Sequence, residues 1–143
     1  MTARTVLAFD VGEARVGVAV GNTLLREATP LAIVPALPRE SMFGEIGQLL
    51  SAWQPQLLVV GLPRGVNGED TPMTARCERF ANQLNGRFNL PVARVDERYS
   101  TLDAESLQRE ARQRGHARAR KTLDDVAAAV ILKRYFDEVD ANA

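Results

Sequence analysis

The chain has 143 residues, of which 45% are hydrophobic and 25% charged, with 18 basic and 18 acidic side chains. These values predict one globular domain spanning residues 1–143 and exclude the low-complexity and fibrous classes of protein. No apolar run approaches the ~20 residues of a membrane span, and the apolar stretch near the N-terminus is too short for a secretory signal. The one cysteine cannot form an internal disulfide, so we expect a cytoplasmic protein without a membrane partner. Because the net charge is zero, a nucleic-acid partner would have to bind to local basic patches.

The first third of the chain predicts three neighbouring strands. Residues 6–10 form an apolar run that ends in Asp10, residues 11–14 are typical of a turn, and residues 16–20 predict the returning strand of a hairpin. Residues 30–34 predict a third strand. Since sequential strands joined by short connections usually pair, we expect these three to form an antiparallel meander.

Helices and strands alternate in the rest of the chain. Residues 57–60 are wholly apolar and lie between two predicted helices, a pattern typical of a parallel strand that is buried on both faces. The other predicted elements, in chain order, are a helix over 40–53, a polar loop over 61–70, a helix over 72–88 capped by Thr71, a strand over 90–95, a helix that begins at Ser100 and a helix over 122–137. The predicted fold class is therefore α/β: a mixed sheet made of an antiparallel three-strand meander plus two parallel strands, with helices on both faces.

Two acidic residues, Asp10 and Glu97, lie where a predicted strand ends. Functional groups of open α/β sheets gather outside the carboxyl ends of the strands, which makes both residues candidates for a site. Taken singly, each has a simpler interpretation. Asp10 can stabilise a turn, and Glu97 beside Arg98 can be a solvated charge.

An acidic pair opens the last predicted helix, which is rich in alanine and too apolar to be exposed. A carboxylate buried there without a partner would be costly. Asp125 fits a capping pattern with Thr122 and lies near the positive end of the helix dipole. Asp124 has no such role, so it is the better candidate for a metal ligand.

Three carboxylates that converge would suit a hard divalent cation, Mg²⁺ or Mn²⁺. Two such ions can activate a water and stabilise the leaving oxygen of a phosphodiester. The chain has one histidine and one cysteine, so a zinc cluster is not predicted, and a Ser-His-Asp site would have to rely on His116 in a predicted loop. We therefore predict a metal-dependent phosphodiesterase site in which Asp10, Glu97 and Asp124 are the catalytic residues and the metal ligands.

Four ordered motifs resemble those of the YqgF/RuvX family of pre-16S rRNA nucleases and Holliday-junction-resolvase-like proteins. They are FDVG at 9–12 with RVGVAV at 15–20, VGLP at 60–63 with NGE at 67–69, VDERYST at 95–101, and LDDVAA at 123–128. The resemblance covers essentially the whole chain. It implies an RNase H-like fold, a divalent-metal nuclease activity and a role in maturing the 5′ end of 16S rRNA, with catalytic roles for Asp10, Glu97 and Asp124.

One position departs from the family pattern. Members often have Thr or Ser after the glycine of the first turn, and this chain has Glu13. A carboxylate at that position could join the metal site or repel a substrate phosphate.

Basic residues near the predicted acids are candidates for substrate binding. Arg15 and Arg98 flank the ends of the two predicted strands and could bind phosphate or neutralise the neighbouring acids. The segment 109–121 carries six basic residues, which could follow a phosphate backbone or form a solvated helix face. Beside a nuclease-like site we favour substrate contact. The candidate residues in that segment are Arg114, Arg118 and Arg120.

The expected partner is structured RNA, namely precursor rRNA, with ribosomal particles as a further partner, and the expected state is a monomer or weak dimer. Two alternatives stay open. A resolvase of branched DNA would use the same chemistry but would need a two-fold symmetric dimer, and the sequence does not indicate a dimer interface. A non-catalytic nucleic-acid or transcription-complex binding factor would not require the intact acidic triad.

Overall fold

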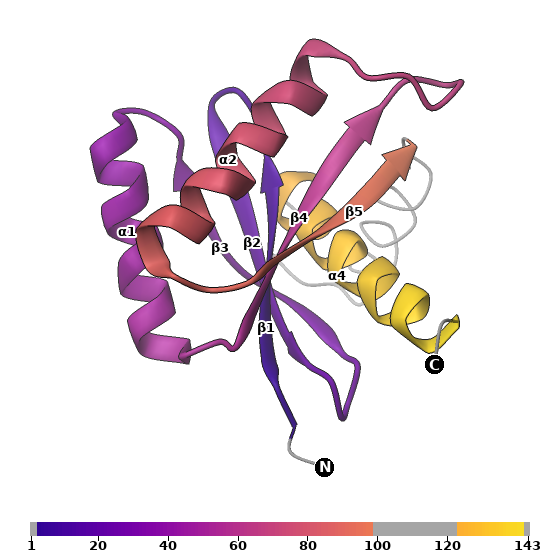
Figure 1. Ribbon diagram of the computed structural model, residues 1–143. Coiled ribbons are helices and arrows are strands. Elements are labelled where there is room, and N and C mark those ends of the chain that lie inside the picture. The colour runs from indigo at the N-terminus through magenta and orange to yellow at the C-terminus, as the bar shows by residue number, and fades with distance from the viewer. Residues whose placement is uncertain (1–2, 99–122, 142–143) are drawn as a thin grey trace, which may run out of the picture.

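A mixed sheet with the strand order β3-β2-β1-β4-β5 forms the centre of the molecule (Figure 1). The strands are β1 (Thr5–Val11), β2 (Arg15–Asn22), β3 (Ala28–Pro35), β4 (Leu57–Arg64) and β5 (Val92–Arg98). β1, β2 and β3 are antiparallel neighbours, whereas β4 and β5 run parallel to β1. This computed structural model describes residues 3–98 and 123–141, apart from the side chains of residues 98, 123–125 and 140–141. The predicted meander with two added parallel strands is confirmed.

Helices cover both faces of the sheet, as predicted (Figure 1). The helices are α1 (Arg39–Trp53), α2 (Pro72–Phe88) and α4 (Leu123–Ala141). The first two pack on one face, here called the α1/α2 face, and the third packs on the opposite α4 face. None of the helices in the described ranges is long and apolar enough to cross a membrane. The helix predicted to begin at Ser100 lies outside the described residues.

Local sequence signals explain where the helices on the α1/α2 face begin and end. The Thr71 hydroxyl accepts a hydrogen bond from the Thr74 amide at 3.3 Å, and the Thr74 hydroxyl accepts one from the Thr71 amide at 2.9 Å. This capping box with Pro72 at the first helical position starts α2 at the predicted residue. α1 ends before Gln54, which adopts a left-handed conformation with φ 46° and precedes Pro55.

Side-chain alternation along β1 separates two hydrophobic cores. Leu7, Phe9 and Val11 pack into the core under α1 and α2, whereas Val6 and Ala8 pack into the core under α4. Burying one such large side chain contributes about 1.5–3 kcal/mol. Because successive residues of a strand point to opposite faces, these two cores also fix the face on which the next residues of each strand lie.

Two predicted boundaries at the carboxyl edge are wrong. β4 continues through residues 61–64, which were predicted to be part of a loop, and β5 continues through residues 96–98. The reason is backbone pairing between these two segments, which aligns Leu62 with Asp96 and Arg64 with Arg98. Main-chain hydrogen bonds continue the sheet beyond the apolar residues from which the strands were predicted.

Candidate active site

Asp10 is the last residue but one of β1, and it lies on the α4 face because Ala8, two residues earlier, packs under α4. It is half-buried. On β2, Asp10 pairs with Gly17. On β4, Phe9 pairs with Val60, so the next residue, Gly61, is the neighbour of Asp10. The residue next to Asp10 is therefore a glycine on both neighbouring strands.

Glu97 is the last residue but one of β5 and lies on the same α4 face as Val95. Its Oε2 lies 3.5 Å from the position that a Cβ atom on Gly61 would occupy. The side chain thus extends back over β4 towards the strand that carries Asp10. β4 lies between β1 and β5, so the sheet brings two of the three predicted acids to the same edge and the same face, on either side of Gly61.

α4 runs across this face from the acidic edge towards the opposite end of the sheet. Its Ile131 contacts Gly61 near Glu97, whereas Phe136 contacts Gly21, which pairs with Val6 near the start of β1. The helix therefore begins on the side of the carboxyl ends of the strands. Asp124 is the second residue of α4, seven residues before Ile131 and hence on the same helical face. Its side chain is not among those described.

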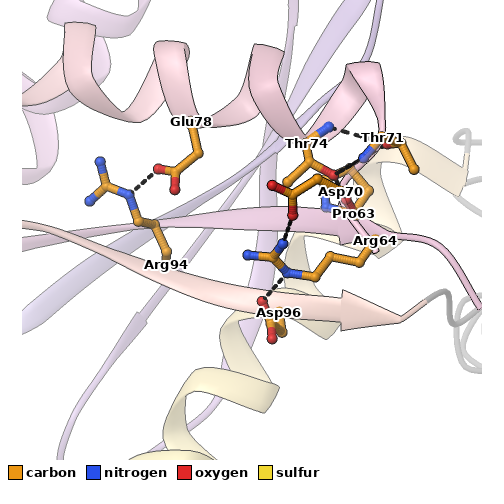
Figure 2. A network of polar contacts seen from close by, with 8 residues as sticks. All are labelled: Pro63, Arg64, Asp70, Thr71, Thr74, Glu78, Arg94 and Asp96. Atoms are coloured by element: carbon orange, nitrogen blue, oxygen red, sulfur yellow. Dashed lines mark hydrogen bonds and ion pairs between the residues drawn. The ribbon is translucent and has the colours of Figure 1, made fainter. Parts of the chain in front are cut away.

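Arg64 connects the ends of β4 and β5 on the α1/α2 face (Figure 2). Its Nε donates to Asp96 Oδ1 at 2.7 Å, its Nη1 donates to Asp70, and both interactions are ion pairs. The hydrogen bond that Arg64 donates to Asp96 is the main reason that the pKa of Arg64 is raised. Asp96 is thus engaged on one face of the sheet while its neighbour Glu97 lies on the other. Arg64 was not predicted from the sequence, because its partner Asp96 is 32 residues away.

The Cys77 thiol has a raised pKa in the folded protein. Cys77 is buried in the core under α2, and its pKa is raised to about 12 by desolvation and then by the negative charge of Asp10, with a smaller contribution from Glu97. No function was predicted for this cysteine, and its burial makes it a core residue.

A divalent cation fits the chemistry of this donor set. Asp10 and Glu97 offer carboxylate oxygens, which are the hard ligands that Mg²⁺ and Mn²⁺ prefer. No group of three acidic, histidine or cysteine side chains suited to a metal occurs among the described residues. A further ligand would thus have to come from another part of the chain, and Asp124 is the predicted one. Glu13 is described and forms no such group, and it lines a cavity with α2 instead.

The predicted basic residues are only partly described. Arg15 is the first residue of β2, and its carbonyl oxygen accepts a hydrogen bond from the Gly12 amide at 2.8 Å, which closes the turn after Asp10. Arg98 is the last residue of β5, and its side chain is not described. Both backbone positions lie at the acidic edge of the sheet. Arg114, Arg118 and Arg120 lie outside the described residues.

Comparison with known proteins gives a match over nearly the whole chain. The family model described as "RuvX: Holliday junction resolvase" matches residues 4–138. Proteins of Burkholderia vietnamiensis and Burkholderia multivorans named "Putative pre-16S rRNA nuclease" are 54% and 53% identical over 135 residues, which make up 94% of this chain and 90% of theirs.

Solved structures that resemble this one share its fold at low sequence identity. RuvC of T. thermophilus, solved in complex with a Holliday junction substrate, has a TM-score of 0.58 and 15% identity over 97% of this chain and 98% of its own. The fowlpox virus Holliday junction resolvase has a TM-score of 0.56 and 12% identity over 97% and 99% of the two chains. The predicted RNase H-like fold is confirmed, and with the match over residues 4–138 the chain belongs to the RuvX family.

Proposed function

We propose that the protein is a metal-dependent nuclease that hydrolyses phosphodiester bonds of RNA, namely in the maturation of the 5′ end of precursor 16S rRNA. One structural observation carries the proposal: Asp10 and Glu97 lie on either side of Gly61, at the carboxyl edge and on the α4 face of the sheet. Membership of the RuvX family and the name of the Burkholderia relatives support the reaction and the substrate.

In this proposal Asp10, Glu97 and Asp124 hold Mg²⁺ or Mn²⁺. When bound, such an ion stabilises charge on the phosphodiester oxygens and lowers the pKa of an attacking water. The chain contributes the fixed orientation of the ligands. β1 and β5 hold two of the carboxylates in a paired sheet, and α4 begins on the side of the same edge with Asp124 in its first turn.

The substrate in this proposal is bound by basic side chains. They are Arg15, Arg98, Arg114, Arg118 and Arg120. Guanidinium groups suit phosphate because they donate two parallel hydrogen bonds and remain charged. A reaction of this kind belongs in the cytoplasm, on structured precursor rRNA or ribosomal particles, and a monomer is sufficient for a single cut.

The family description and the RuvC complex favour one alternative, the resolution of branched DNA. That reaction cuts two strands symmetrically and would require a dimer, even a weak one, with two sites related by a two-fold axis. A binding factor without catalysis is a third option, and it would not depend on metal.

A cleavage assay separates these options. Purified protein is incubated with precursor 16S rRNA and with a four-way DNA junction, each in Mg²⁺, in Mn²⁺ and in excess chelator. We expect 5′-end cleavage of the RNA that is abolished by chelator and reduced on the order of a hundredfold or more by Asp10→Asn, which removes one charged ligand but preserves side-chain volume. Cleavage of the junction alone would favour the resolvase, and tight binding of RNA without cleavage would favour the binding factor.

The first turn of α4 offers a matched control. Asp124→Asn removes the predicted ligand, whereas Asp125→Asn removes the neighbouring acid that fits a capping role. Loss of cleavage in the first variant and retention in the second would support the assignment. Equal loss in both variants, or persistence in chelator, would contradict the mechanism.

A further inference from the structure

A cavity of about 490 Å³ opens on the α1/α2 face, on the opposite side of the sheet from the α4 face that carries Asp10. It is formed by the turn after β1, the connection from β3 to α1, and one side of α2. Its volume is within the range of ligand pockets, roughly 300–1,000 Å³. No step of the proposed reaction uses this cavity.

Three arginines give the cavity a positive character. Arg39, Arg76 and Arg79 line it together with one acid, Glu13. Arg76 Nη2 donates to the carbonyl oxygen of Glu13 at 3.3 Å, which ties α2 to the turn. The salt bridges between described side chains involve other arginines, namely Arg64, Arg87 and Arg94. Arg39 and Arg79 take part in none of those salt bridges, so their guanidinium groups are the ones that can bind an anionic ligand.

The rest of the cavity wall is apolar. Val11, Val16 and Phe80 belong to the core and form the inner part of the wall. Met73 lines the cavity as a partly buried residue, and Leu37 leaves 66% of its surface exposed at the same place. An apolar wall beside guanidinium groups suits a ligand that has both a flat apolar body and a phosphate, which is the chemistry of a nucleotide.

The cavity and the candidate active site share one turn. Val11, Gly12 and Glu13 line the cavity, and they directly follow Asp10 in the chain. The Asp10 side chain and the cavity lie on opposite faces of the sheet, so a strand of nucleic acid held at Asp10 reaches the cavity by passing round the carboxyl edge at this turn. The ligand best placed to enter is therefore a part of the substrate itself.

We propose that this cavity, the Arg39/Arg76/Arg79 pocket, binds one nucleotide unit of the RNA strand next to the cleaved bond. Its phosphate contacts the guanidinium groups, and its base lies against Leu37 and Met73. The proposal rests on the proposed nuclease function, since it requires an RNA strand at Asp10.

Binding of single-stranded oligoribonucleotides tests the pocket without catalysis. In an Asp10→Asn background with chelator, the chain length is increased by one nucleotide at a time, and inorganic phosphate and free nucleoside monophosphates serve as further probes. The variant Arg39→Gln/Arg79→Gln removes two exposed guanidinium groups. The matched control, Arg4→Gln/Lys133→Gln, removes the same charge at two exposed positions outside the cavity, one just before β1 and one on α4.

We expect the pocket variant to weaken binding of the longer oligonucleotides by about tenfold, while the control changes it far less. The slope of log Kd against log salt should fall by about 0.7 for one lost phosphate contact. Glu13→Gln should act in the opposite direction and tighten binding, because it removes the one negative charge of the pocket. Equal effects of the pocket and control variants on binding would overturn the proposal, and so would weaker binding by Glu13→Gln. The proposal would also be wrong if the protein bound free nucleoside monophosphates but its affinity for oligonucleotides did not depend on their length.

Cleavage by the Asp10-containing protein distinguishes failure of this inference from failure of the proposed function. A substrate too short to reach the pocket should be cleaved equally by wild type and by the pocket variant, whereas a longer one should show a raised KM in the variant. If both substrates are cleaved equally by the two proteins, the nuclease stands and the pocket assignment is wrong. If the wild type cleaves neither substrate and its RNA binding does not depend on strand length, the nuclease function and the pocket assignment are both wrong.

Discussion

Gly61 of β4 and Ile131 of α4 are in such close contact that a Cβ atom on the glycine would lie 2.6 Å from Cδ1 of the isoleucine. The same hypothetical atom would lie 3.5 Å from Oε2 of Glu97. The absence of a side chain at this position therefore has two consequences. It lets Ile131 of α4 approach the sheet closely, and it lets the Glu97 carboxylate extend over β4.

Gly61→Ala should destabilise the protein by about 1–3 kcal/mol, because the added methyl overpacks the interface between β4 and α4. Ile131→Val removes the nearest clashing atom and by itself should cost about 0.5–1.5 kcal/mol. The double variant should lose less stability than the sum of the two single variants, and the difference should be on the order of 1 kcal/mol. Urea unfolding of the four proteins measures this coupling, and strict additivity would show that the contact does not limit the helix position.

Glu97→Gln should reduce metal-dependent cleavage on the order of a hundredfold, since it removes a charged ligand on the α4 face. Asp96→Asn is the matched control, because it neutralises the adjacent carboxylate, which is bound to Arg64 on the other face. We expect it to retain most of the activity, because the amide oxygen of Asn can still accept the hydrogen bond from Arg64 Nε. Single-turnover cleavage rates compare the two, and the opposite order of activities would contradict the assignment of faces.

Arg64→Lys should lower cleavage by about tenfold while the protein remains folded, because a lysine cannot contact Asp70 and Asp96 with the planar geometry of a guanidinium. The variant keeps the charge, so an effect on activity would show that the geometry at the end of β5 matters. The metal affinity of Arg64→Lys, measured by calorimetry, should also be weaker than that of the wild type. Arg87→Lys, which alters an exposed pair with Glu40 elsewhere on the surface, is the control.

Because of Cys77, the free energy of unfolding should decrease as the pH rises in the alkaline range. The pKa of its thiol is raised from an ordinary value of 9.0 to about 12 in the folded protein, so between these values the unfolded chain releases a proton that the folded chain retains. The unfolded state then binds fewer protons, and the free energy of unfolding decreases by up to ~1.4 kcal/mol per pH unit, with no such effect below pH ~9. The difference in unfolding free energy between wild type and Cys77→Ala, followed from pH 7 to pH 10.5, isolates this contribution from the other groups that titrate. A difference that is constant over that range would contradict the raised pKa.

Much of the fold could be predicted from local patterns. The apolar runs and their spacing predicted the five strands, and Thr71-Pro72 predicted the start of α2 to the residue. Strand ends were less predictable, because the last residues of β4 and β5 are held by pairing between segments about 30 residues apart in the chain. A polar residue such as Arg64 gives no local sign of such pairing.

The candidate site was predicted as a set of residues, whereas its arrangement was not. Asp96 and Glu97 are adjacent acids, and the sequence cannot tell which of them lies on the face that α4 covers. The tertiary structure decides it, because Val95 packs under α4 and strand alternation then places Glu97 on the same side. The cavity with three arginines is likewise assembled from three separated segments, and none of them indicates it alone.

The sequence by itself therefore determined which elements form, and that an acid lies near the carboxyl end of a strand at Asp10 and at Glu97. Those properties depend on side-chain periodicity and on capping within a few residues. Only the tertiary structure decided that β4 lies between β1 and β5, that Gly61 separates the two acids, and that α4 runs away from that edge. The physical reason is that strand order, register and helix direction are set by contacts between distant segments, whose energies local patterns do not contain.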